Sequence, residues 1–225
     1  GKSWQPVNGD AGTPWRAACF IDFELGVVAG AEGRLSLVGG EQLLASKLPP
    51  QGLRSIRSVT ISGEETGWLA GDGGLLLRTG SGGVVWESPV GSLPDELRIG
   101  MDFRCVDARG DNVWLVGSPG SVVWHSQNGG RTWQRSLTGQ ATPLNAIRFI
   151  SNQVGIAVGE LGVILRTEDG GKSWASVRGA NRRAAVLSLQ SRPSQVTAAM
   201  LAKLSGEQGY RGAVWIASRQ DLGPM

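Results

Sequence analysis

The hydrophobic positions of this chain fall in short runs that are separated by glycine-rich turns. One kind of run ends in glycine, at residues 67–71, 113–117 and 155–159. A second kind follows shortly after it, at residues 75–78, 122–125 and 163–166. An alternating run, such as residues 145–150, precedes the pair. Short apolar runs bounded by turn residues predict β-strands, three in each set.

A glycine-containing octet follows each set of runs. Residues 126–133 read Ser-Gln-Asn-Gly-Gly-Arg-Thr-Trp, and residues 167–174 read Thr-Glu-Asp-Gly-Gly-Lys-Ser-Trp. Residues 79–86 are a weaker copy, and residues 1–4 match the end of another. A further strand after each octet completes a repeat of roughly 40 to 47 residues. Four strands at this period predict an all-β fold made of β-propeller blades.

Residues 13–48 fit one more blade whose octet is eroded, with strands expected at 17–23, 26–30, 35–38 and 42–46. Residues 1–180 therefore hold four recognisable blades and a stray outer strand at residues 3–8. Because that outer strand has no blade of its own, we expect an incomplete ring and a chain that is a fragment of a longer protein. Unpaired apolar faces at the two ends of such an arc would favour association.

The octets are expected to act as staples between the third and fourth strands of a blade. Asp or Asn accepts backbone N–H groups within the turn, glycine supplies positive φ, and Trp anchors the outer strand by burying its ring. Replacing Trp174 with Ala should cost about 3–5 kcal/mol. The residues assigned to this role are Ser126, Asn128, Gly130, Thr132, Trp133, Thr167, Asp169, Gly171, Ser173 and Trp174.

The composition of the chain excludes several classes of function. The 225 residues include 35 Gly and nine Trp, contain no apolar run long enough to span a membrane, and carry a net charge of +3 without a Lys/Arg-rich segment. A membrane span and a nucleic-acid partner are therefore not expected. With His125 as the single histidine and two cysteines, we expect no metal and no cofactor. Cys19 and Cys105 fall on first strands of blades that are not neighbours, so they should not form a disulfide.

The pattern changes after residue 180. Residues 184–189 and 212–217 read as strands, and residues 195–205 have apolar positions at helical spacing. Residues 181–225 therefore predict a βαβ segment, which belongs to an α/β domain and not to a propeller.

The octets are the Asp-boxes, or BNR repeats, of sialidase-like propellers, and residues 155–174 resemble a blade of the photosystem II stability/assembly factor family. The resemblance extends over residues 1–179. It implies a non-catalytic β-propeller that binds a protein partner, within a membrane-protein complex of photosynthesis. It also implies an extracytoplasmic location, in the periplasm or the thylakoid lumen.

The C-terminal segment is similar to the start of zinc-dependent LmbE/PIG-L-like deacetylases, on Gly209-Tyr210-Arg211 and residues 218–221. The matching loop, residues 192–195, retains only Pro193 and lacks the His and Asp that would hold zinc and activate water. This resemblance implies a catalytically inactive copy, and it leaves open that the blades are part of a larger deacetylase-like protein.

The motifs are compatible with two classes of function. A binding or assembly module would present arginines, whose planar fork suits carboxylate and peptide recognition. The candidates are Arg54, Arg57, Arg78, Arg104, Arg148 and Arg166. A glycoside hydrolase or carbohydrate-binding Asp-box propeller is the alternative. A sialidase is disfavoured because the single tyrosine, Tyr210, lies outside the blades.

Overall fold

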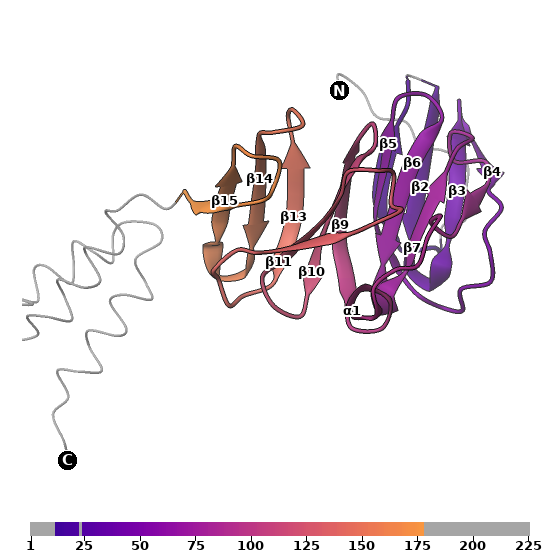
Figure 1. Cartoon of the computed structure of the whole chain (residues 1–225). Helices are drawn as coiled ribbons and strands as arrows, with labels where there is room; N and C mark the ends of the chain where they lie inside the picture. The colour runs from indigo at the N-terminus through magenta and orange to yellow at the C-terminus, as the bar shows by residue number, and fades with distance from the viewer. Residues whose placement is uncertain (1–11, 23, 178–225) are drawn as a thin grey trace, which may run out of the picture. The chain divides into compact units, whose positions relative to one another are not determined.

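The computed structural model describes residues 12–22 and 24–177, which form four antiparallel sheets of four strands each (Figure 1). Within every sheet the strands are neighbours in chain order, so each sheet is a simple meander. The prediction of all-β, blade-like repeats is confirmed. The stray strand at residues 3–8 and the βαβ segment at 181–225 lie outside the described residues, so both remain predictions.

The first sheet contains β1 (Trp15–Phe20), β2 (Leu25–Gly30), β3 (Leu35–Gly39) and β4 (Gln42–Ala45). The second contains β5 (Ile56–Ser62), β6 (Thr66–Gly71), β7 (Leu76–Thr79) and β8 (Trp86–Glu87). The third contains β9 (Asp102–Arg109), β10 (Asn112–Ser118), β11 (Val122–Ser126) and β12 (Gln134–Leu137). The fourth contains β13 (Leu144–Phe149), β14 (Gly155–Gly159), β15 (Ile164–Thr167) and β16 (Ala175–Ser176).

Short helical turns join some of these strands. Single 3-10 turns, Ala31–Gly33, Asp72–Gly74 and Glu160–Gly162, link the second strand to the third in the first, second and fourth sheets. The α-helical turn α1 (Asp95–Arg98) lies between the second and third sheets, and the sequence pattern does not predict it. Its Leu97 is fully buried, and the carbonyl of Pro94 accepts the N–H groups of Leu97 and Arg98. Burial of one leucine therefore stabilises a turn too short to show helical periodicity.

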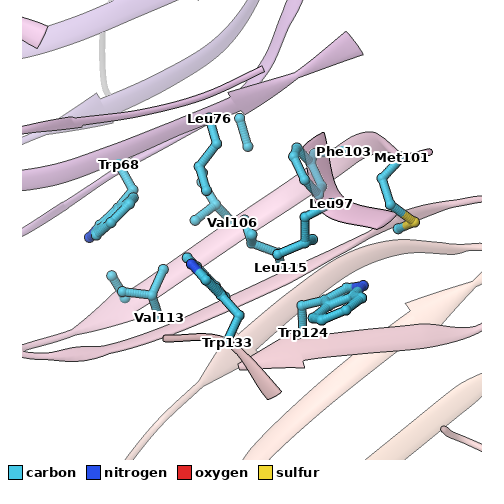
Figure 2. Packing of buried hydrophobic residues seen from close by; sticks show 12 residues of the cluster. Trp68, Leu76, Leu97, Met101, Phe103, Val106, Val113, Leu115, Trp124 and Trp133 are labelled. Carbon is cyan, nitrogen blue, oxygen red and sulfur yellow. The ribbon is translucent and has the colours of Figure 1, made fainter. Parts of the chain in front are cut away.

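Consecutive sheets pack face to face, with their first strands β1, β5, β9 and β13 adjacent in that order. The core consists of three apolar clusters, one at each junction between sheets. Figure 2 shows the middle one, in which Trp68 and Leu76 of the second sheet meet Val106, Leu115 and Trp133 of the third. The core therefore lies between the sheets, as layered β-folds require.

Each octet lies in the turn between the third and fourth strands, as its sequence predicts. In residues 126–133, Ser126 Oγ accepts the N–H of Gly130 at 2.9 Å, and Asn128 Oδ1 accepts the N–H of Thr132 at 2.9 Å. In residues 167–174, Thr167 and Asp169 accept the equivalent N–H groups, and the indole N–H of either tryptophan donates to a glycine carbonyl. These hydrogen bonds lower the pKa of Asp169 well below its ordinary value, chiefly through Ser173.

Both cysteines are free thiols on first strands. Cys19 Sγ accepts the N–H of Ile61 on β5, whereas Cys105 Sγ lies 3.6 Å from the carbonyl oxygen of Ile147 on β13. Each thiol therefore contacts the sheet that follows its own. Burial raises the pKa of the Cys105 thiol.

Candidate functional site

Every first strand starts with a β-bulge at the same repeat position. The register between first and second strand shifts at Arg16 on β1, Arg57 on β5, Arg104 on β9 and Asn145 on β13. A bulge leaves one residue out of the ladder and re-aims its side chain. Four equivalent polar side chains are therefore displaced at the same end of adjacent strands.

A glycine at the end of the second strand makes room for each bulge. A Cβ on Gly71 would lie 2.0 Å from the carbonyl oxygen of Ser55, and one on Gly117 would lie 2.0 Å from that of Asp102. A Cβ on Gly30 would lie 2.5 Å from the carbonyl oxygen of Pro14, and one on Gly159 would lie 2.6 Å from that of Pro143. The glycine at the end of each run that forms a second strand is thus required by the close approach of the first-strand backbone.

The bulge residues converge on an open cavity of about 420 Å³. Asp102 and Ser118 complete its lining, and both come from strand ends in the third sheet. The lining set is Arg16, Arg57, Asp102, Arg104, Ser118 and Asn145. We call this cavity the bulge pocket; its wall carries three guanidinium groups and one carboxylate.

Arg57 is held by a carboxylate of its own sheet. Its guanidinium binds both oxygens of Asp72, with Nη2 donating to Oδ2 at 3.2 Å, and this hydrogen bonding raises the pKa of Arg57. Asp102 Oδ1 accepts the N–H of Gly73 at 2.7 Å, which ties the Asp72–Gly74 turn to the third sheet. Arg57 is therefore oriented before any ligand arrives.

Arg104 and Arg16 differ in their surroundings. Arg104 Nη1 donates to Asn145 Oδ1 and, at 2.6 Å, to Glu160 Oε1 of the fourth sheet. Within residues 12–22 and 24–177, Arg16 makes neither an ion pair nor a side-chain hydrogen bond. In its own sheet, Arg16 has Ala31 at the place where Arg57 has Asp72, and the carboxylate of the following sheet, Asp72, is already paired with Arg57.

The arrangement can bind an anion without performing chemistry. A guanidinium has five N–H donors in a planar fork, and Arg57 and Arg104 each use only part of theirs on protein acceptors. Arg16 is exposed and uses none of its donors on the described residues. Carboxylate groups match this fork geometry.

A second cavity, of about 490 Å³, lies at the other end of the first strands. Here the buried Asp107 accepts the N–H of Phe149 at 2.6 Å and the Nη1 of Arg148 at 3.0 Å, both from the fourth sheet. Burial raises the pKa of Asp107. Because both carboxylate oxygens are engaged across the junction, Asp107 joins two sheets.

The structure distributes the six predicted arginines over several places. Arg57 and Arg104 line the bulge pocket, whereas the Arg54 side chain lies beside Gly73 and is not part of the lining. Arg148 lines the second cavity instead. Arg78 and Arg166 lie on the third strands β7 and β15 and line neither cavity.

Sequence reasoning missed Arg16 and Asn145. Superimposing the repeats on the glycine that ends each second strand would have placed Arg16, Arg57 and Asn145 in one column, with Arg104 one position away from it. That column is the signal that the run pattern alone does not show.

Among the described residues, no three His, Cys, Asp or Glu side chains are grouped so as to hold a metal ion. In the same part of the chain, no helix is long and apolar enough to cross a membrane.

Known proteins of similar sequence are photosystem II assembly factors. The chain is 31% identical over 123 residues to the photosystem II assembly lipoprotein Ycf48 of Synechococcus sp. (strain CC9902), covering 52% of this chain and 34% of that protein. It is 30% identical over 119 residues to the chloroplastic photosystem II stability/assembly factor HCF136 of Arabidopsis thaliana, covering 49% of this chain and 29% of that protein. The chain thus spans about a third of the length of these curated relatives.

Solved structures share the fold. A structure of YCF48 bound to D1 peptide has a TM-score of 0.51 at 16% identity, with 77% of this chain and 84% of that chain covered. An ancestral GH74 enzyme has a TM-score of 0.61 at 13% identity, with 79% and 25% covered. At such identities the likeness concerns the fold alone.

The family profile described as photosynthesis system II assembly factor YCF48 matches residues 53–176, which contain the bulges at Arg57, Arg104 and Asn145. The match covers more than half of the sequence, and the chain therefore belongs to the YCF48 photosystem II assembly factor family.

Proposed function

We propose that this chain is a non-catalytic assembly factor that binds an extended peptide segment of a photosystem II protein in the bulge pocket. The observation that carries the proposal is the convergence of Arg16, Arg57 and Arg104 on one cavity. Family membership and the likeness to YCF48 bound to D1 peptide support a peptide as the ligand. The guanidinium groups would bind carboxylates of that peptide.

The carboxylates near the pocket support binding and not hydrolysis. Asp72 and Glu160 are paired with Arg57 and Arg104, and Asp102 accepts a backbone N–H. A glycosidase needs one carboxyl group to protonate the leaving oxygen and a second as base or nucleophile. Robust turnover of aryl glycosides by the purified chain would overturn the assignment.

The location of the protein follows from the same proposal. The relatives are a lipoprotein and a chloroplastic protein, which supports an extracytoplasmic site on the membrane where photosystem II is assembled. The partner would then be a membrane-protein complex that the chain meets from outside the bilayer.

Binding of a fluorescein-labelled D1 peptide, followed by fluorescence anisotropy, tests the role of the pocket. We expect Arg16→Ala and Arg104→Ala to weaken binding by about 10- to 100-fold each, since a hydrogen bond to a charged group contributes about 1.5–3 kcal/mol. Arg166→Ala is the matched control, because Arg166 is exposed, pairs with Glu168 and lies outside the pocket.

The peptide affinities of the three variants together show whether the bulge pocket binds the peptide. Equal affinities for the wild type and both pocket variants would overturn the proposal, as would a loss of binding in Arg166→Ala as large as theirs. We also expect the affinity of the wild type to fall as salt is raised, because exposed guanidinium groups are screened.

A further inference from the structure

The 3-10 turn Glu160–Gly162 has a leucine at a position where the backbone favours glycine. Its middle residue, Leu161, adopts φ 54° and ψ 26°. The middle residues of the other two 3-10 turns adopt the same left-handed conformation, with φ 62° at Gly73 and φ 55° at Glu32. A Cβ is disfavoured in this region, and a bulky side chain makes such a residue an outlier. The backbone of the turn therefore does not explain the leucine.

Burial does not explain the leucine either. Leu161 is 81% exposed. Glu32 and Gly73 are exposed too, although another sheet follows each of their sheets in the chain. Exposure therefore belongs to this turn position and does not result from the fourth sheet being the last one described. A strained and exposed leucine stabilises the fold little, and residues of this kind cluster at binding sites.

Hydrogen bonds hold this turn beside the bulge pocket. Glu160 Oε1 accepts Arg104 Nη1 at 2.6 Å, and the Glu160 N–H donates to the carbonyl oxygen of Pro143 at 3.0 Å. Pro143 directly precedes β13, whose bulge residue Asn145 lines the pocket. Leu161 follows Glu160, so its Cα lies about 3.8 Å from that of a residue that is paired with a lining arginine.

We infer that Leu161 is an apolar subsite of the bulge pocket, where it contacts an aliphatic or aromatic side chain of the bound peptide. The inference rests on the proposed function and adds the class of peptide to it. Arg104 binds a carboxylate through its remaining donors, and Leu161 binds an apolar residue close to that carboxylate in the peptide. Covering the exposed leucine removes apolar surface from water, which favours binding.

Fluorescence anisotropy with the fluorescein-labelled D1 peptide and the full 225-residue chain tests this contact. We expect Leu161→Gly and Leu161→Ala to weaken binding about three- to tenfold each, since covering one leucine removes only part of its surface from water. Agreement between the two variants excludes an effect of glycine flexibility. Ile150→Ala is the matched control, at an aliphatic residue that is 74% exposed and follows β13 at the opposite end from Asn145.

Urea denaturation distinguishes a role in binding from a role in folding. Leu161→Gly should have a midpoint equal to or above that of the wild type, because glycine adopts positive φ without strain. A lower midpoint would assign the leucine to folding and overturn the inference.

Peptide variants show whether the contact is direct. Each apolar residue of the D1 peptide is replaced with serine in turn, and one replacement should weaken binding to the wild type without further weakening binding to Leu161→Gly. Replacements that weaken both proteins equally would overturn the inference, as would equal losses in Leu161→Gly and Ile150→Ala.

The Arg104→Ala variant separates this inference from the proposed function. If Arg104→Ala weakens binding and Leu161→Gly does not, the apolar subsite is wrong and the bulge pocket remains the binding site. If the wild-type chain does not bind the peptide, both are wrong. Raising the salt concentration should reduce the effect of Arg104→Ala and leave that of Leu161→Gly in place, because salt screens charges and not apolar contacts.

Discussion

His125 lies in an environment that departs clearly from that of a free side chain. It is buried, stacks on Trp114 with ring centroids 4.9 Å apart, and its Nε2 lies 3.1 Å from Asn112 Oδ1. Burial, with a smaller contribution from the charge of Lys172, lowers the pKa of His125 to about 4. The ordinary value is near 6.5, so the unfolded chain binds a proton that the folded chain rejects between these values.

Stability should therefore fall as the pH is lowered from about 6.5 toward 4, with a slope from this residue of at most about 1.4 kcal/mol per pH unit. The measurement is urea denaturation followed by tryptophan fluorescence at several pH values. His125→Gln should show a shallower dependence because glutamine does not titrate. An unchanged slope in the variant would show that other groups cause the dependence.

The octets are alike in their hydrogen bonds but not in the burial of their tryptophans. Trp133 is buried and meets Trp68 of the preceding sheet edge to face, with ring centroids 6.2 Å apart. Trp174 is partly buried, and its ring meets Phe149 of its own sheet at 6.1 Å. The first ring thus contributes to a junction between sheets, and the second contributes mainly within one sheet.

We expect Trp133→Ala to lower the free energy of unfolding by about 3–5 kcal/mol and Trp174→Ala by an amount at or below the lower end of that range. Denaturation by urea, with circular dichroism as the signal, measures both, and Leu53→Ala provides an exposed control. A larger loss for Trp174→Ala than for Trp133→Ala would contradict this ranking.

Across the whole molecule, stability depends on how each sheet is joined to the next. The junction between the third and fourth sheets includes a polar contact as well as apolar packing, because buried Asp107 binds Arg148 and the Phe149 N–H. The Arg148 side chain is 75% exposed, whereas that of Asp107 is almost fully buried. The backbone N–H is therefore the partner that would lose most if the carboxylate were removed.

Asp107→Ala should cost about 1–3 kcal/mol, since it leaves a buried N–H without an acceptor. Arg148→Ala should cost less than about 1 kcal/mol, because an exposed guanidinium contributes little. Thermal unfolding of both variants gives the comparison. Equal losses would mean that the ion pair, and not the backbone hydrogen bond, carries the contact.

The sequence by itself determined the four blades, the turn role of the octets and the absence of a long apolar segment. These features are local: strand periodicity, glycine at positive φ and Asx-type turn hydrogen bonds are all encoded within a few residues. The α1 turn escaped prediction because a single buried leucine stabilises it, through packing with residues distant in sequence.

Only the tertiary structure decided which arginines form a site. Arg57 and Arg104 belong together with Arg16 because a bulge opposite a glycine displaces each of them, and because adjacent first strands bring the bulges to one cavity. Arg148 lies further along its own first strand and therefore reaches the cavity at the other end. Strand register and the order of the sheets set these positions, and neither can be read from the residue types of a single repeat.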